Sequence, residues 1–139
     1  MVPLRSLALL LLAAVAAGCD SPRKELDRHD LTMAVKSLGS LSAEAEVLTE
    51  ELEQQHVTEA FALAHQQALA QESLKLSGQL AKPVSAKLEA PQQQAAQLNL
   101  RLRQTLLQVA RAARPEQLAQ LRHGFQELGA QAKALGEAL

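Results

Sequence analysis

The side chains that could carry chemistry are few, because the chain of 139 residues contains one cysteine, Cys19, and four histidines. A single cysteine excludes an internal disulfide bond and a zinc site built from several thiolates. Residue types and spacing indicate no serine–histidine–aspartate set, phosphate-binding loop or pair of catalytic carboxylates. We therefore expect the protein not to be an enzyme and to carry no cofactor.

The histidines offer one pattern with metal-binding spacing. Glu53 and His56 are spaced like the Glu-x-x-His motif of carboxylate-bridged di-iron bundles, which need two such motifs and two more glutamates. Only one motif is present, so a solvated helix face is the simpler interpretation. His123 lies two residues before Phe125, about 200° around a helix, and should point away from the apolar face that Phe125 shares.

The start of the chain carries the most specific pattern. Arg5 precedes an unbroken apolar run over residues 7–17, which is shorter than the about 20 residues that span a bilayer. The run ends in Ala16-Ala17-Gly18-Cys19, which resembles the lipobox of bacterial lipoproteins, with Ala16 where that family usually has leucine. The resemblance implies a signal peptide over residues 1–18 and an acylated Cys19, which makes the lipid bilayer an expected partner.

Asp20 directly follows the cysteine. In the enterobacterial sorting rule an aspartate at this position keeps a lipoprotein in the inner membrane, so the resemblance implies that location, facing the periplasm. The outer membrane is the alternative. Residues 19–40 are expected to form a lipidated tether, in which a short helix from Pro22 to Leu38 could end at Gly39. A solvated tether without that helix is the other interpretation.

Composition indicates an all-α protein. Alanine (26 residues), leucine (28) and glutamine (16) make up half of the chain, and isoleucine, tryptophan and tyrosine are absent. Strands draw on β-branched and aromatic residues, and valine and threonine together number only eleven. The formal net charge of −1 argues against a nucleic-acid-binding protein.

Helical periodicity divides the rest of the chain. We expect one long helix over residues 40–80, because the polar stretch at residues 53–57 contains no turn residue; a kink there is the alternative. Residues 82–91 are the clear loop, and Pro91 and Pro115 begin two further helices, over residues 91–113 and 115–139. The last helix has one apolar face: Leu118, Leu121, Phe125, Leu128, Ala132, Leu135 and Leu139.

The helix lengths predict an antiparallel three-helix bundle within a domain over residues 41–139. Residues 57–80, 91–113 and 115–138 would each be roughly 36 Å long. Residues 41–55 would either extend the long helix as an arm or fold back as a fourth helix, so a four-helix bundle is the alternative. Antiparallel packing about the loop would bring Arg111 near Glu59.

Three function classes follow from this organisation. The first is a membrane-tethered, non-enzymatic helical module that binds an envelope protein or itself. Its possible interaction face lies on one arc of the long helix: Phe61, His65, Leu69 and Leu76. The second is a periplasmic helical bundle that binds a metal or small ligand, supported only by the histidines. The third is an immunity or exclusion lipoprotein. We favour the first.

Overall fold

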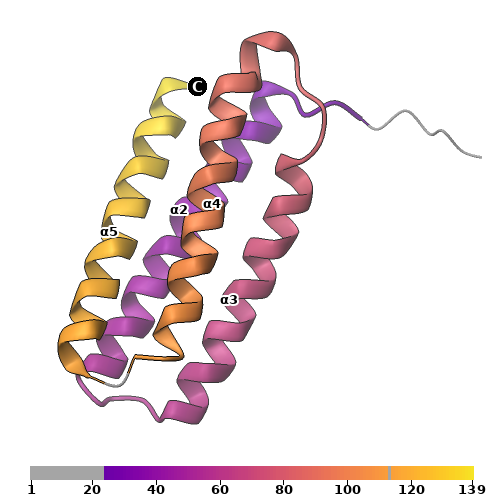
Figure 1. The fold of residues 1–139 in the computed structure, drawn as a ribbon. Coiled ribbons are helices and arrows are strands. Elements are labelled where there is room, and N and C mark those ends of the chain that lie inside the picture. The colour runs from indigo at the N-terminus through magenta and orange to yellow at the C-terminus, as the bar shows by residue number, and fades with distance from the viewer. Residues whose placement is uncertain (1–23, 113) are drawn as a thin grey trace, which may run out of the picture.

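The computed structural model describes residues 24–112 and 114–139, and this part of the chain is helical without strands. Four long helices form an antiparallel bundle: α2 (Arg28–Glu53), α3 (Glu59–Leu80), α4 (Glu89–Val109) and α5 (Pro115–Ala138) (Figure 1). A short 3₁₀ helix, η2 (Ala86–Leu88), precedes α4. The helix α2 packs most extensively on α5, and α3 packs on both α4 and α2. The all-α class is therefore confirmed.

The expectation of a three-helix bundle with one long helix is wrong, and the four-helix alternative matches the described chain. The helix α2 ends at Glu53, and Gln55 takes a φ of 58°, in the left-handed region. Thr58 then caps α3, because its Oγ1 accepts a hydrogen bond of 3.2 Å from the backbone N–H of Phe61. The chain thus reverses at a turn without glycine or proline, and residues 41–53 pack along the bundle instead of forming an arm.

Gly39 does not end a helix, so the expectation of a short helix that stops at Gly39 is wrong. The helix α2 begins after Asp27, whose Oδ1 accepts a hydrogen bond of 2.8 Å from the backbone N–H of Asp30, and it continues through Gly39 to Glu53. Residues 28–40 therefore belong to the bundle and not to a tether, since Leu31 and Leu38 are fully buried in its core.

Leu26 is the first buried residue of the described part of the chain. This side chain is 5 % exposed, and its backbone N–H donates a hydrogen bond of 2.8 Å to the carbonyl of Pro83. All buried hydrophobic side chains of the described residues lie from Leu26 onward. The segment from Leu26 to the C-terminus therefore contains the whole of this core.

The second half of the chain follows its sequence pattern closely. Pro115 is the first residue of α5, as expected, and Leu118, Phe125, Leu128, Ala132 and Leu135 on the predicted face are buried. Leu121 and Leu139 on the same face are partly buried. The helix α4 begins at Glu89, two residues before the expected start.

A buried polar cluster joins α3 to α4. The Nδ2 of Asn99 donates to the Ser73 carbonyl and to Ser77 Oγ, both at 2.9 Å, and its Oδ1 accepts from Ser73 Oγ at 2.8 Å. Gln66 is also buried and its Nε2 donates to the Leu106 carbonyl at 3.1 Å. Each bond forms only when these residues lie side by side, so the cluster fixes the register of the two helices.

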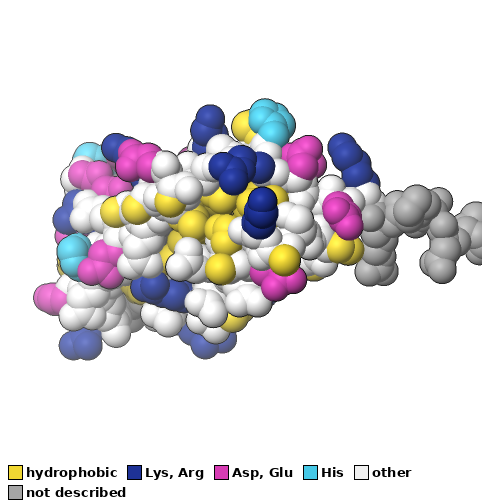
Figure 2. All heavy atoms as spheres, turned by 90° about the horizontal axis from the view of Figure 1, so that it is seen from above, with side chains coloured by type: hydrophobic (Ala, Val, Ile, Leu, Met, Phe, Trp, Pro, Cys, Tyr) yellow, Lys and Arg dark blue, Asp and Glu magenta, His cyan; other side chains and the backbone are white. Residues whose placement is uncertain are grey.

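The ends of the bundle are distinct. The start of α2, the α3–α4 connection and the end of α5 lie together at one end (Figure 1), where Arg28 Nη1 donates to the Leu139 carbonyl at 2.6 Å. Seen toward that end, hydrophobic side chains gather in the middle and charged side chains lie around them (Figure 2). No helix within residues 24–112 and 114–139 has the length and hydropathy of a membrane span.

Candidate functional site

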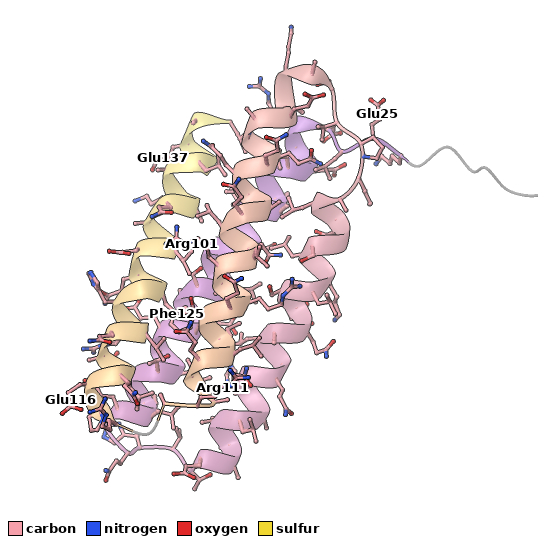
Figure 3. The ribbon with its side chains drawn as sticks, viewed as in Figure 1. Glu25, Arg101, Arg111, Glu116, Phe125 and Glu137 are labelled. Carbon is pink, nitrogen blue, oxygen red and sulfur yellow. The ribbon has the colours of Figure 1, made fainter. Side chains whose placement is uncertain are left out.

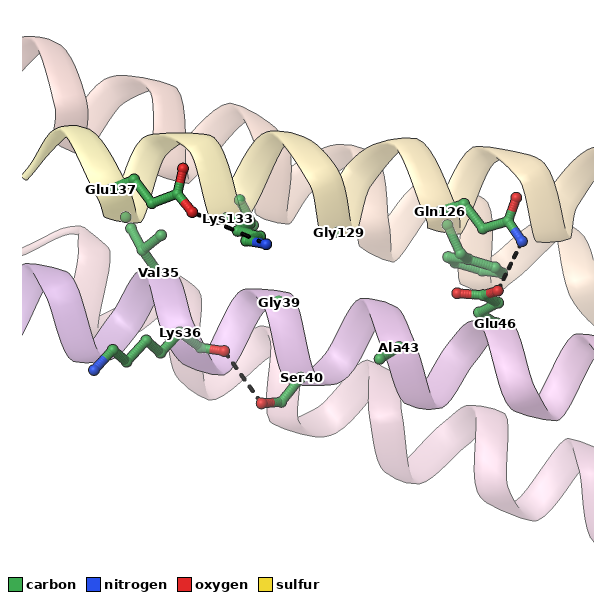
Figure 4. A pocket seen from close by; sticks show the side chains of 13 residues that line it. Val35, Lys36, Gly39, Ser40, Ala43, Glu46, Gln126, Gly129, Lys133 and Glu137 are labelled. Carbon is green, nitrogen blue, oxygen red and sulfur yellow. Dashed lines mark hydrogen bonds and ion pairs between the residues drawn. The ribbon is translucent and has the colours of Figure 1, made fainter.

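A groove of about 800 Å³ lies between α2 and α5. Small residues face one another across this seam, Gly39 and Ala43 from α2 and Gly129 from α5 (Figure 4). Ala132 and Gly136 of α5 also line the groove. A Cβ added at Gly39 would lie 3.9 Å from Ala132 Cβ. The helices therefore approach closely, and the missing side chains leave the groove open above the seam.

The floor of the groove is apolar. Val35 and Phe125 line it and are 1 % and 0 % exposed, so the groove is closed below by the packed core. Phe125 lies near mid-height on α5, and Arg111 and Glu116 mark the end of the bundle where α4 meets α5 (Figure 3). The floor is thus formed by buried side chains of both helices.

Charged and polar side chains form the two rims. On the α5 rim, Lys133 Nζ lies 4.0 Å from Glu137 Oε1. Across the groove, Gln126 Nε2 donates a hydrogen bond of 2.7 Å to Glu46 Oε1 (Figure 4). Lys36 stands on the α2 rim. A strip of small and apolar residues between charged rims is the surface that an amphipathic helix covers with its apolar face.

The four residues expected to form an interaction face do not share one surface. Leu69 and Leu76 are 3 % and 4 % exposed and belong to the core, whereas Phe61 is 55 % exposed. The Phe61 ring meets the His65 ring edge-on with centroids 5.9 Å apart, and His65 Nε2 lies 3.9 Å from Glu44 Oε2 of α2. Only Phe61 and His65 are therefore at the surface, beside the α2–α3 seam.

The histidine patterns do not come together as a site. Glu53 Oε2 lies 3.4 Å from Arg122 Nε. His56, in the turn after α2, has its Nδ1 3.3 Å from Oε2 of Glu51. Within residues 24–112 and 114–139, no three histidine, cysteine, aspartate or glutamate side chains are grouped so that they could hold a metal ion.

His123 is exposed and lies 3.3 Å from Glu127 one turn further along α5. Since Phe125 is fully buried, the helical phase predicted for this pair is confirmed.

Arg111 and Glu59 line one surface depression at the end of the bundle where α2 meets α3, as the antiparallel arrangement predicted. The glutamates at the end of α2 contact an arginine of α5 instead. Arg122 Nη1 lies 3.7 Å from Glu50 Oε1, besides its contact with Glu53. Arg122 therefore links the acidic end of α2 to α5.

The lipobox residues, Cys19 with Asp20, lie outside the described residues, as does the predicted signal peptide. Sequence reasoning missed the groove because it interpreted Gly39 as a helix stop. The available signal was the spacing of Gly129 and Gly136, seven residues apart on one face of α5.

Comparison of the chain with protein-family models, with curated proteins and with solved structures found no match.

Proposed function

We propose that the protein is a membrane-tethered, non-enzymatic helical module of the cell envelope that binds an envelope protein or a second copy of itself through the α2–α5 groove. The observation that carries this proposal is the groove itself. Its floor is formed by Val35, Phe125 and small residues, and its rims carry Lys36, Glu46 and Lys133. Apolar contact would provide affinity and the rim charges would select orientation, which is how helix-in-groove recognition works.

The lipobox resemblance of Ala16 to Cys19 supports the tethered location. Leu26, seven residues beyond Cys19, is the first buried side chain of the described chain. A chain of seven residues spans at most about 25 Å. The bundle would therefore stay close to the bilayer, and Asp20 supports the inner membrane as the bilayer concerned.

The anchor is tested by replacing the cysteine. Cys19→Ala should abolish labelling with a palmitate analogue, whereas Ser21→Ala should label like the native protein. Membrane fractionation of the native protein and of Asp20→Ser tests whether Asp20 determines the membrane. We expect the native protein in the inner membrane and the variant in outer-membrane fractions. Labelling that persists in Cys19→Ala would refute the anchor.

The groove is tested by placing a long charged side chain in it. Ala43 lines the groove and is exposed, so Ala43→Arg should leave the bundle folded. Ala68, exposed on α3, is the matched control. The native protein and Ala68→Arg should capture the same partner proteins from membranes, and Ala43→Arg should fail to capture them. Equal capture by both variants would refute binding through the groove.

A further inference from the structure

We infer that the occupant of the α2–α5 groove is a second copy of this chain, packed antiparallel across a two-fold axis at the level of Leu41. This inference rests on the proposed role of the groove as a protein-binding surface. Three features support a second copy: the register of α2 on α5, the positions of the rim charges along these helices, and one exposed apolar side chain.

The register of the two helices is fixed by contacts within the chain. Val35 of α2 lies beside Gly136 of α5, and Ser42 lies beside Gly129. Because the helices are antiparallel, each step forward on α2 is a step backward on α5. Leu41 therefore stands level with residue 130 on α5.

Charges on α2 are self-complementary about that level. Lys36 is five residues before Leu41 and Glu46 is five residues after it, and both line the groove. A two-fold axis perpendicular to the helices at Leu41 places Lys36 of each copy level with Glu46 of the other. The interface would thus contain two equivalent opposite-charge pairs.

The apolar positions obey the same symmetry. Gly39 and Ala43 are two residues either side of Leu41, so the small positions of one copy meet those of the other. Val47 is 56 % exposed, six residues after Leu41, and comes level with Val35 in the groove of the second copy. This places an otherwise unpaired valine over an apolar floor.

A parallel dimer gains no net charge pairing. With the two-fold axis along the helices, α2 of one copy would face α5 of the other at the same level. Lys36 is one residue from Val35 and Lys133 is three residues from Gly136, so the two lysines would stand within about 3 Å of one level. Glu137 lies two residues from the same level on the other side, so Lys36 would stand as near to this carboxylate as to Lys133 and the two contacts would offset each other. The antiparallel arrangement, by contrast, adds two Lys36–Glu46 pairs without a like-charge contact at Lys36.

The arrangement is compatible with two anchored chains. The axis is perpendicular to the bundle, so the two segments leading back from Leu26 emerge at opposite ends of the dimer. With the axis along the membrane normal, both chains can reach one bilayer while the bundles lie along its surface.

Cross-linking in native membranes tests the geometry. Ser40 lines the groove one residue from the axis level. Two copies of Ser40→Cys would then be offset by only about 3 Å along the helices, within reach of a disulfide. Mild oxidation of the full-length variant should give a covalent dimer. Gln71→Cys, on the exposed face of α3, is the matched control and should stay monomeric.

Charge reversal tests the pairing itself. In a chain beginning at Asp20, which keeps all of the described core, sedimentation should show a dimer. Lys36→Glu and Glu46→Lys should each raise its dissociation constant about tenfold or more, because two attractive pairs become repulsive. The double variant should restore native affinity, with far-UV circular dichroism unchanged throughout.

The outcomes separate this inference from the proposed function. A monomer in sedimentation, or equal cross-linking of Ser40→Cys and Gln71→Cys, overturns the second copy as occupant. If Ala43→Arg then still abolishes capture of a different envelope protein, the proposed function stands without the dimer. If neither capture nor self-association responds to Ala43→Arg, both are wrong.

Discussion

Replacing Phe125 with alanine should be among the most damaging single changes to the bundle. Its side chain is fully buried between α5 and α2 and closes the floor of the groove. Phenylalanine-to-alanine changes in a core cost about 3–5 kcal/mol, through lost apolar burial and the cavity left behind. Because water can enter from the groove, part of the cavity penalty is relieved. We therefore expect a loss near 3 kcal/mol of unfolding free energy.

Urea unfolding followed by far-UV circular dichroism measures this loss directly. The midpoint should fall for Phe125→Ala while the dependence of unfolding free energy on urea stays the same. His123→Ala is the matched control: its side chain is 72 % exposed on the same helix, and the change should cost less than about 0.5 kcal/mol. A larger loss for His123→Ala, or a loss under about 1 kcal/mol for Phe125→Ala, would refute the orientation of α5.

Three further changes probe the bundle away from the groove floor, each measured by the same unfolding assay. Asn99→Ala should cost about 2–4 kcal/mol, because three hydrogen bonds to α3 are lost in a buried site; a neutral result would show that the cluster does not stabilise the α3–α4 pair. Gly124→Ala should raise stability by about 0.5–1 kcal/mol, since the new Cβ would meet only Thr105 Cγ2 at 3.9 Å; destabilisation would mean that α4 and α5 pack more closely. Arg122→Ala should cost about 1–2 kcal/mol, because Glu53 Oε2 is buried without a hydrogen-bond partner in the described chain and Arg122 is the cation beside it; an unchanged midpoint would place that pair among surface ion pairs of no consequence.

The start and the buried face of α5 could both be predicted from local sequence pattern. Its start at Pro115 and its buried face could be predicted because both depend on the 3.6-residue period and on the fixed φ of proline. The break after α2 could not. Gln55 takes the left-handed backbone conformation in that turn, and glutamine is not a residue type that indicates such a conformation.

The candidate groove was beyond prediction for a related reason. Glycine inside a helix is unfavourable by about 0.5–1 kcal/mol relative to alanine, so Gly39 was interpreted as a helix end. In the folded chain Gly39 faces Ala132, and the close approach of the two helices gives the glycine its role. That role depends on a partner helix over ninety residues away in the sequence.

Local sequence pattern is enough to predict the helical class, the loop after α3, and the start and core face of α5, because each depends on neighbours within a few residues. Long-range packing sets the reversal at Gln55, the single helix over residues 28–53, and the pairing of this helix with α5. Those choices depend on which apolar faces bury one another, just as the register of α3 on α4 depends on the hydrogen bond between Ser73 and Asn99. Such contacts join residues distant along the chain, and their free energies enter only when the helices meet.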